Sequence, residues 1–221
     1  MTVLFVVGTI VFFFVIDFAV RKLRGESLLP AVRPAQIPHY PVRIPEGIFF
    51  AKSHTWISLF PSGKIRLGVD DFVGRLLKTP EVIFLRKPGD SVKKGDPLMQ
   101  LKSAKHVLTI SSPLDGDVLE ANEELADHSE LLQQSLFDNG WGYVIKPKRS
   151  TEVKEMLLGN EARTWIRNEF RRLRELLIAL ATPGTVEPAF LQDGGLPTVG
   201  VLDNMDDEAW QTVEHEFLEI Q

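Results

Sequence analysis

The sequence predicts a mainly β domain, a small flattened barrel or sandwich with short helices, preceded by one transmembrane helix and followed by an amphipathic helix and an acidic tail. Three observations predict it. Residues 97–102 and 107–112 are extended runs in which apolar side chains recur at or near every second position. Short Gly-Asp patterns repeat on both sides of these runs. Residues 3–20 form an apolar stretch with a single charge.

The first segment, residues 1–24, is predicted to be a membrane anchor. Residues 3–20 are rich in Phe, Val and Ile and reach about the minimum length of a membrane-spanning helix. A cleaved signal peptide is the alternative, but the charged start and the small-residue cleavage site are missing. Asp17 is expected at the membrane interface, and a deeper position would mark a partner helix. Basic residues follow the helix and none precedes it, which predicts a single pass through the cell inner membrane with the rest of the chain in the cytoplasm: Arg21, Lys22 and Arg24.

Residues 25–45 carry five prolines without a hydrophobic period, which predicts an extended linker. Residues 46–150 then form one domain of ordinary composition, since the whole chain is 44% hydrophobic and 25% charged. The elements expected in this domain, besides the central hairpin, are a hairpin of residues 56–60 and 64–68, a helix of residues 70–77, a strand of residues 81–85 and a helix of residues 130–135.

The central hairpin has its predicted tip at residues 103–106, between the two alternating runs. The flanks resemble each other: Gly89 and Gly95 precede the hairpin, and Gly116 and Asn122 follow it. Each flank is predicted to hold one short strand, which stops at a residue that tolerates positive φ, Gly95 before the hairpin and Asn122 after it. Two similar halves around one turn predict a barrel with two-fold pseudo-symmetry that presents its middle turn at the surface.

Several chemistries are excluded by composition. The chain has no cysteine, which removes disulfides, thiol nucleophiles and thiolate metal sites. The five histidines are too far apart in sequence for a local metal motif, and no nucleophile elbow, phosphate-binding loop or dinucleotide fingerprint occurs. With a net charge of −5, nucleic-acid binding is not expected. We therefore expect a protein that is not itself an enzyme and holds no metal.

Residues 151–181 are predicted to form an amphipathic helix, with helical periodicity from residue 153 to residue 180. One face carries arginines three or four positions apart: Arg163, Arg167, Arg171 and Arg174. Such a stripe is typical of a solvated face. On a membrane-anchored chain, anionic headgroups or an acidic partner surface are the functional alternatives.

The tail, residues 182–221, has nine acidic residues and no lysine or arginine. Most of it up to residue 200 should lack regular structure. Asn204 or Asp206 can then cap a final short helix with Trp210 and Phe217 on its apolar face. Because so short a helix is not stable alone, it must dock, either on the arginine stripe of this chain or on another protein.

Taken together, several segments resemble the lipoyl-carrier family, and most closely the H protein of the glycine cleavage system. The resemblance runs from about residue 48 to about residue 177 and rests on Phe-Ala-Lys-Ser-His-Thr-Trp at 50–56, Gly-Val-Asp-Asp-Phe at 68–72, Ser-Pro-Leu-Asp-Gly at 112–116 and Gly-Trp at 140–141. The family implies a flattened β-barrel that carries lipoate in amide linkage. Its lysine lies at the hairpin tip, eight residues before a proline, which here gives Lys105 and Pro113.

The tip departs from the family in charge. The H protein usually has a glutamate three residues before its lysine and an acidic residue about four after it, where this chain has Lys102 and Thr109. A reversed charge should weaken recognition by an enzyme that attaches lipoate. An unmodified turn lysine is the alternative for Lys105, and His106 beside it could tune the amine or have no role.

Two functional hypotheses follow. The first is a non-enzymatic, membrane-anchored accessory subunit that uses a degenerate H-protein-like domain to dock on an integral membrane protein complex, most plausibly a bioenergetic one. The anchor, the linker, the tail and the altered charges favour it. The second is a membrane-tethered carrier with lipoate on Lys105, which the position of that lysine before Pro113 supports.

Overall fold

The computed structural model describes residues 42, 44–180, 197–203 and 205–218. Within these ranges, no helix combines the length and the apolar character that a membrane crossing requires. The predicted anchor, residues 1–24, lies outside the described residues, as does most of the predicted linker. The transmembrane helix therefore stays a prediction.

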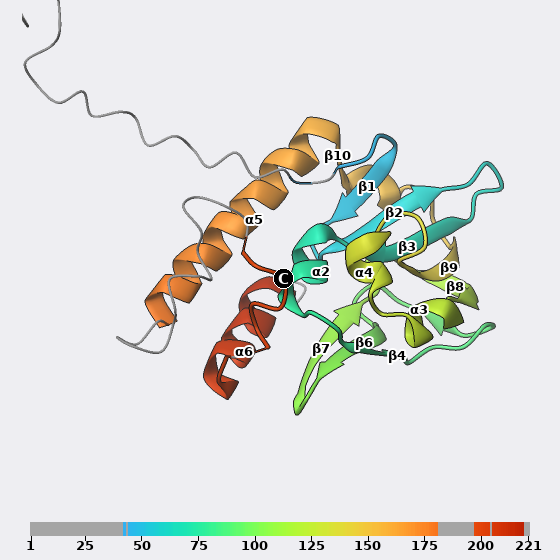
Figure 1. Ribbon diagram of the computed structural model, residues 1–221. Helices are drawn as coiled ribbons and strands as arrows, with labels where there is room; N and C mark the ends of the chain where they lie inside the picture. The colour runs from blue at the N-terminus through green and yellow to red at the C-terminus, as the bar shows by residue number, and fades with distance from the viewer. Residues whose placement is uncertain (1–41, 43, 181–196, 204, 219–221) are drawn as a thin grey trace, which may run out of the picture. The chain divides into compact units, whose positions relative to one another are not determined.

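Two antiparallel sheets make up the body of the domain (Figure 1), which confirms a mainly β fold with short helices. The larger sheet has the order β10-β1-β2-β3-β9-β8-β5, and the smaller has the order β4-β6-β7. Side chains from both sheets, among them Ile57, Leu67, Leu101 and Leu108, meet in one buried cluster. The strands are β1 Ile48–Ala51, β2 Thr55–Leu59, β3 Ile65–Val69, β4 Glu81–Phe84, β5 Ser91–Val92, β6 Pro97–Ser103, β7 His106–Ser111, β8 Gly116–Ala121, β9 Trp141–Pro147 and β10 Leu157–Leu158.

Both predicted hairpins are confirmed. Strands β2 and β3 pair from Thr55 opposite Val69 to Leu59 opposite Ile65. Strands β6 and β7 pair up to Ser103 opposite His106, so that two residues remain for the turn. In the smaller sheet, β7 is the edge strand among the described residues. The central hairpin therefore projects from the domain with one strand edge free of any further strand.

The two similar halves around this hairpin pair with each other. The amide of Gly89 donates to the carbonyl of Val118 at 2.8 Å, and the amide of Gly95 donates to the carbonyl of Ser112 at 2.8 Å. Both glycines have positive φ, 98° and 91°, which a residue with a Cβ rarely adopts. The two Gly-Asp turns before the hairpin thus bond to the segment after it, whereas the third Gly-Asp pair, residues 116–117, begins strand β8.

The helices are short except for one: α2 Asp71–Leu76, α3 Glu123–Asp127, α4 Leu131–Gln134, the 3₁₀ turn η1 Glu152–Glu155, α5 Gly159–Leu180, α6 Asp207–Val213 and the π-helical turn η3 Glu214–Leu218. The predicted helices at residues 70–77 and 130–135 are confirmed as α2 and α4. The final helix is also present, and the Asp206 carboxylate caps it by accepting from the Ala209 amide at 2.9 Å.

The predicted start of the long helix is wrong. The helix begins at Gly159, while Leu157 and Leu158 form strand β10, which pairs with Phe49 and Phe50 of β1. Gly159 has a φ of 58°, which separates the strand from the helix. Two adjacent leucines fit a buried strand as well as a helical stripe, so periodicity alone could not place this boundary.

Gly116 permits the close approach of β8 and β9. A Cβ at this position would lie 2.4 Å from Ile145 Cγ2 and 2.9 Å from the Lys146 carbonyl oxygen. We expect Gly116→Ala to lower the free energy of unfolding by about 1–3 kcal/mol, because the strands must move apart. Urea unfolding checks this. The exposed Glu120→Ala on the same strand should change stability by less than about 0.5 kcal/mol, and equal effects of the two substitutions would contradict the packing argument.

Candidate functional site

Lys105 lies in the two-residue turn between β6 and β7, at the tip of the projecting hairpin (Figure 1). Ala104 before it has a φ of 51°, a left-handed conformation that is uncommon for a residue with a side chain. The Lys105 side chain is 69% exposed. The turn therefore presents a primary amine to solvent, eight residues before Pro113.

The Lys105 amine is not free, because it contacts the tail. Its Nζ donates to Asp207 Oδ1 at 2.5 Å, and His106 Nε2 lies 2.8 Å from the same oxygen. Hydrogen bonds from Lys105 and then from His106 hold the pKa of the Asp207 carboxyl below its ordinary value. Asp207 is the first residue of α6, so the tail folds back onto the hairpin tip.

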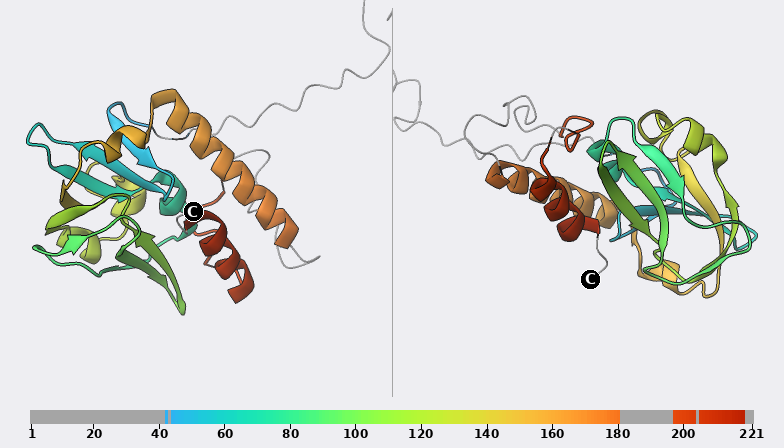
Figure 2. Two further views of the ribbon diagram at one scale, coloured as in Figure 1. Left: turned by 180° about the vertical axis from the view of Figure 1, so that it is seen from behind. Right: turned by 90° about the horizontal axis from the view of Figure 1, so that it is seen from below.

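Two further tail carboxylates contact the same hairpin. Asp203 accepts a hydrogen bond from Ser103 Oγ at 2.8 Å, and its second oxygen accepts from the Lys78 amide at 3.0 Å. Glu214 accepts from the Thr109 amide at 3.4 Å. In both views α6 lies between α5 and the β6–β7 hairpin (Figures 1 and 2). The tail thus follows β7 from the tip toward the base.

The predicted interaction residues Trp210 and Phe217 pack within this chain. Trp210 is 4% exposed, stacks on His106 with 4.5 Å between ring centroids, and donates from Nε1 to the Leu202 carbonyl at 2.9 Å. Phe217 is 6% exposed and lies 5.1 Å from the Phe72 ring, centroid to centroid. The contact between His106 and Trp210 was not predicted, since only the adjacency of His106 to Lys105 pointed to a role.

The four arginines predicted as an interaction face lie on α5: Arg163, Arg167, Arg171 and Arg174. The ion pairs among the described residues join none of them to a tail carboxylate. The tail reaches α5 through Arg172 instead, which lies 3.4 Å from Glu216 and 2.7 Å from Glu169. The Arg172 guanidinium also lies over the Phe217 ring at 4.8 Å. Arg172 follows Arg171 of the stripe directly, but the spacing of three or four positions that defined the stripe left it out.

The reversed charge at Lys102 has a partner on the adjacent strand. Lys102 Nζ lies 3.2 Å from Glu81 Oε2, and the two residues are opposite each other in the β4–β6 pairing. Opposite charges directly across a strand pair are mildly stabilising. The lysine is therefore matched locally by β4, although the chain holds no acid near it in sequence.

His54, in the 50–56 segment of the family resemblance, is buried and hydrogen-bonded. Its Nδ1 lies 2.8 Å from Asp70 Oδ2, and its ring stacks on Phe72 at 4.2 Å. The other oxygen of Asp70 accepts from the amides of Phe72 and Val73 at 3.0 and 3.1 Å, which caps α2. The His54–Asp70 pair therefore has a structural role, because it is buried inside the domain and caps α2.

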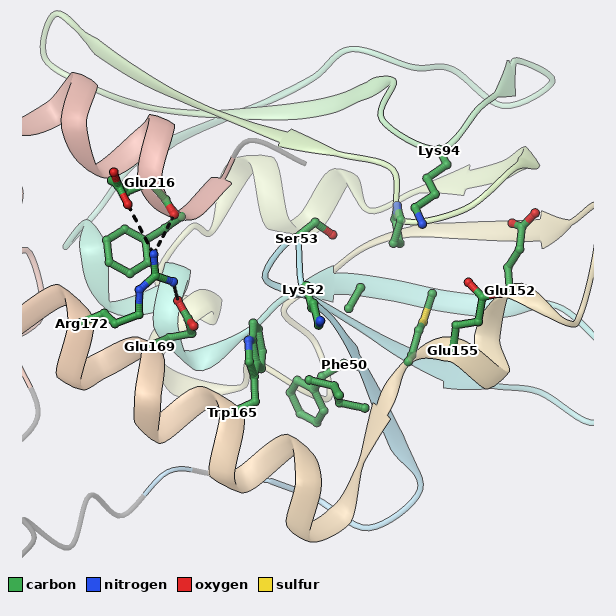
Figure 3. A pocket seen from close by; sticks show the side chains of 15 residues that line it. Phe50, Lys52, Ser53, Lys94, Glu152, Glu155, Trp165, Glu169, Arg172 and Glu216 are labelled. Carbon is green, nitrogen blue, oxygen red and sulfur yellow. Dashed lines mark hydrogen bonds and ion pairs between the residues drawn. The ribbon is translucent and has the colours of Figure 1, made fainter. Parts of the chain in front are cut away.

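A cavity of about 550 Å³ lies beside α5 (Figure 3). Trp165 and Arg172 of α5, Ser53 of the β1–β2 turn and Glu155 of η1 line it, together with Phe217 of the tail. Its charges are of both signs, and Arg172 is already engaged by two carboxylates. Among the described residues, no group of three His, Asp or Glu side chains could hold a metal ion. Because Phe217 lines the cavity and Asp207 contacts Lys105, the tail connects the hairpin tip to one wall of the cavity.

The Asp207 carboxyl should titrate below its ordinary pKa of 3.8. Because the folded pKa is lowered, the stabilisation of the docked tail is present above pH 3.8 and is lost as the pH falls through the folded value. Carbon NMR of the carboxyl resonances measures this pKa. The Lys105→Gln substitution should raise it, whereas Lys64→Gln, at an exposed lysine of the β2–β3 loop, should leave it unchanged. An unaltered Asp207 pKa in Lys105→Gln would contradict the pairing.

Comparisons with known proteins agree with this architecture. The profile of the family described as Glycine cleavage H-protein matches residues 48–169. A probable glycine cleavage system H protein of Pyrococcus furiosus is 34% identical over 116 residues, 52% of this chain and 86% of the relative. A glycine cleavage system H protein of Halalkalibacterium halodurans is 29% identical over 128 residues, 57% of this chain and 98% of the relative.

A crystal structure of a glycine cleavage system H protein from Mycobacterium marinum matches with a TM-score of 0.46 and 24% identity, covering 56% of this chain and 98% of that one. The family match ends within α5, so the second half of α5 and the tail lie outside it. Residues 48–169 are more than half of the sequence, and this chain therefore belongs to the glycine cleavage H-protein family.

Proposed function

We propose that this chain is a lipoyl carrier, with lipoate in amide linkage to Nζ of Lys105. The observation that carries the proposal is the place of this lysine, exposed in the turn at the tip of the central hairpin and eight residues before Pro113. Relatives that cover the same domain are named as H proteins of the glycine cleavage system. When bound, lipoate supplies a dithiolane that can be reduced and can carry a group on a thiol.

The residues of the tip fit such an attachment. The amine is held on a regular hairpin whose last pair is Ser103 opposite His106, so the attachment point is well defined relative to the domain. The small side chain of Ala104 leaves the turn uncrowded beside it. The Lys105 amine itself is bound only by Asp207 among the ion pairs of the described residues, and its side chain is 69% exposed.

The carrier is proposed to be tethered to the cell inner membrane by residues 1–24, with the domain on the cytoplasmic side. Support comes from the apolar run of residues 3–20 and from the basic residues that follow it. The arginine stripe of α5 would then face anionic headgroups or an acidic surface of a membrane protein. A tethered carrier serves partners held at the same membrane, an integral membrane complex among them.

Intact mass and peptide mapping over residues 102–105 test the proposal on protein purified from its native membrane in mild detergent. We expect a lipoyl-sized increment on Lys105 and its complete loss in Lys105→Arg. Arginine keeps the positive charge that contacts Asp207 but does not accept the acyl group, so the tail contact is preserved. Lys94→Arg, at an exposed lysine, should keep the increment. An unmodified Lys105 in the natural protein would sink the carrier proposal.

A second candidate function is that of a non-enzymatic accessory subunit. In this function a degenerate H-protein-like domain docks on a membrane complex. The observation that favours it is that both lysines of the tip are already paired, Lys105 with Asp207 and Lys102 with Glu81. For this function, replacing residues 1–24 should release the protein from its complex in native gel electrophoresis, while Lys105→Arg should change neither assembly nor activity. Full assembly without the anchor would exclude it.

A further inference from the structure

We propose that the C-terminal segment, residues 197–203 and 205–218, is an intramolecular latch on the Lys105 hairpin that must be displaced before a partner protein can use the lysine. The inference rests on the proposed carrier function and adds its regulation. The segment lies beyond residue 169, where the family match ends.

The latch holds the tip through two carboxylates. Asp207 binds Lys105 and His106, and Asp203 binds Ser103, so every residue of the tip except Ala104 contacts the tail. Acylation of Lys105 forms a bond from the Nζ lone pair to an acyl carbon, expels the leaving group of an activated acyl donor and releases the amine protons that the amide does not keep. The Lys105 ammonium must lose a proton before it has a lone pair, and the acyl carbon must reach the side of Nζ that Asp207 Oδ1 now occupies. The ion pair must therefore open first.

Below the tip, the latch covers the outer edge of β7. The Thr109 amide donates to Glu214 rather than to a neighbouring strand, and Trp210 stacks on His106 at the start of the same strand. An enzyme that approaches the hairpin from this side would contact α6 before β7 (Figure 2). The tail thus blocks a protein-sized partner more than it blocks a small reagent.

The strength of the latch is divided unequally along its length. Phe217, toward the base, and Trp210, which stacks on His106, are buried and belong to the main hydrophobic cluster. Lys105 and Asp207 are 69% and 62% exposed, and ion pairs so exposed are weak. Opening of the Lys105–Asp207 contact alone, with Trp210 and Phe217 still docked, is therefore the easiest movement. A partner can start there and replace the tail stepwise.

The contacts also specify the chemistry of the partner. On the hairpin, the groups that bind the tail are Lys105, His106 and the backbone edge of β7. On the tail, the groups that bind them are carboxylates spaced along an amphipathic helix and an indole ring that stacks on the histidine. We expect a competing partner to present an acidic surface with an aromatic side chain. A basic or purely apolar surface would leave the charges of the tip unmatched.

Competitive acylation of the full chain tests the latch. The reagent is an N-hydroxysuccinimide ester of acetate, and mass spectrometry gives the rate at Lys105 relative to exposed Lys64, which has no contact with the tail among the described residues. The double variant Asp203→Asn/Asp207→Asn should raise this ratio by about three- to tenfold, as expected for breaking one or two exposed ion pairs. Hydrogen exchange of the Thr109 amide should become faster in Trp210→Ala, which removes a buried contact of the docked tail.

The control is Asp127→Asn/Asp138→Asn, which changes net charge equally at exposed sites away from the hairpin. It should alter neither the acylation ratio nor the exchange rate. A ratio that is unchanged in the tail variant, or raised equally in both variants, overturns the latch. Thr109 exchange that stays unchanged in Trp210→Ala also overturns it, since the docked tail would then not be what protects the edge of β7. The reagent needs no lipoate-attaching enzyme, so failure of the carrier proposal would leave this result interpretable.

Discussion

The buried hydrogen bond between His54 and Asp70 holds the centre of an aromatic cluster against which α5 and the tail pack. It joins the β1–β2 turn to the start of α2 and holds the His54 ring against Phe72. Trp165 of α5 lies 4.9 Å from the His54 ring, and Phe217 of the tail lies 5.1 Å from Phe72. A buried polar pair of this kind is costly to leave half-made, because the remaining group stays without a partner. A local capping interaction thus sets the platform for distant segments.

Patterns of short range were enough to predict most of the elements. Alternation located β6 and β7, a Gly-containing loop located β2 and β3, and the Asp206 cap located α6. The place of the tail could not be read in the same way. Ser103 and Asp203 are a hundred positions apart, and nothing in the spacing of acids along the tail distinguishes a contact with the hairpin from one with the arginine stripe. Burial and geometry decide between these surfaces, and both arise only after folding.

Charge read along the chain differs from charge arranged in space. Lys102 and Thr109 look like the loss of an acidic pattern, but the folded chain places Glu81 beside the first and Glu214 beside the second. Together with Asp207, these carboxylates restore a negative surrounding to the tip from β4 and from the tail. While the tail is docked, a protein that approaches the hairpin senses this combined field. In that state the departure of the tip from the family pattern is smaller than in the sequence.

Because β7 is at the edge of its sheet, the docked tail also protects the domain from pairing with other strands. An uncovered strand edge offers its amides and carbonyls to any other extended chain, including another copy of the same protein. While Glu214 occupies the Thr109 amide, that pairing is blocked. While the tail is undocked, the exposed edge of β7 can therefore pair with another extended chain and promote self-association. Crowding of copies of this chain would favour a cover that closes again quickly after each encounter.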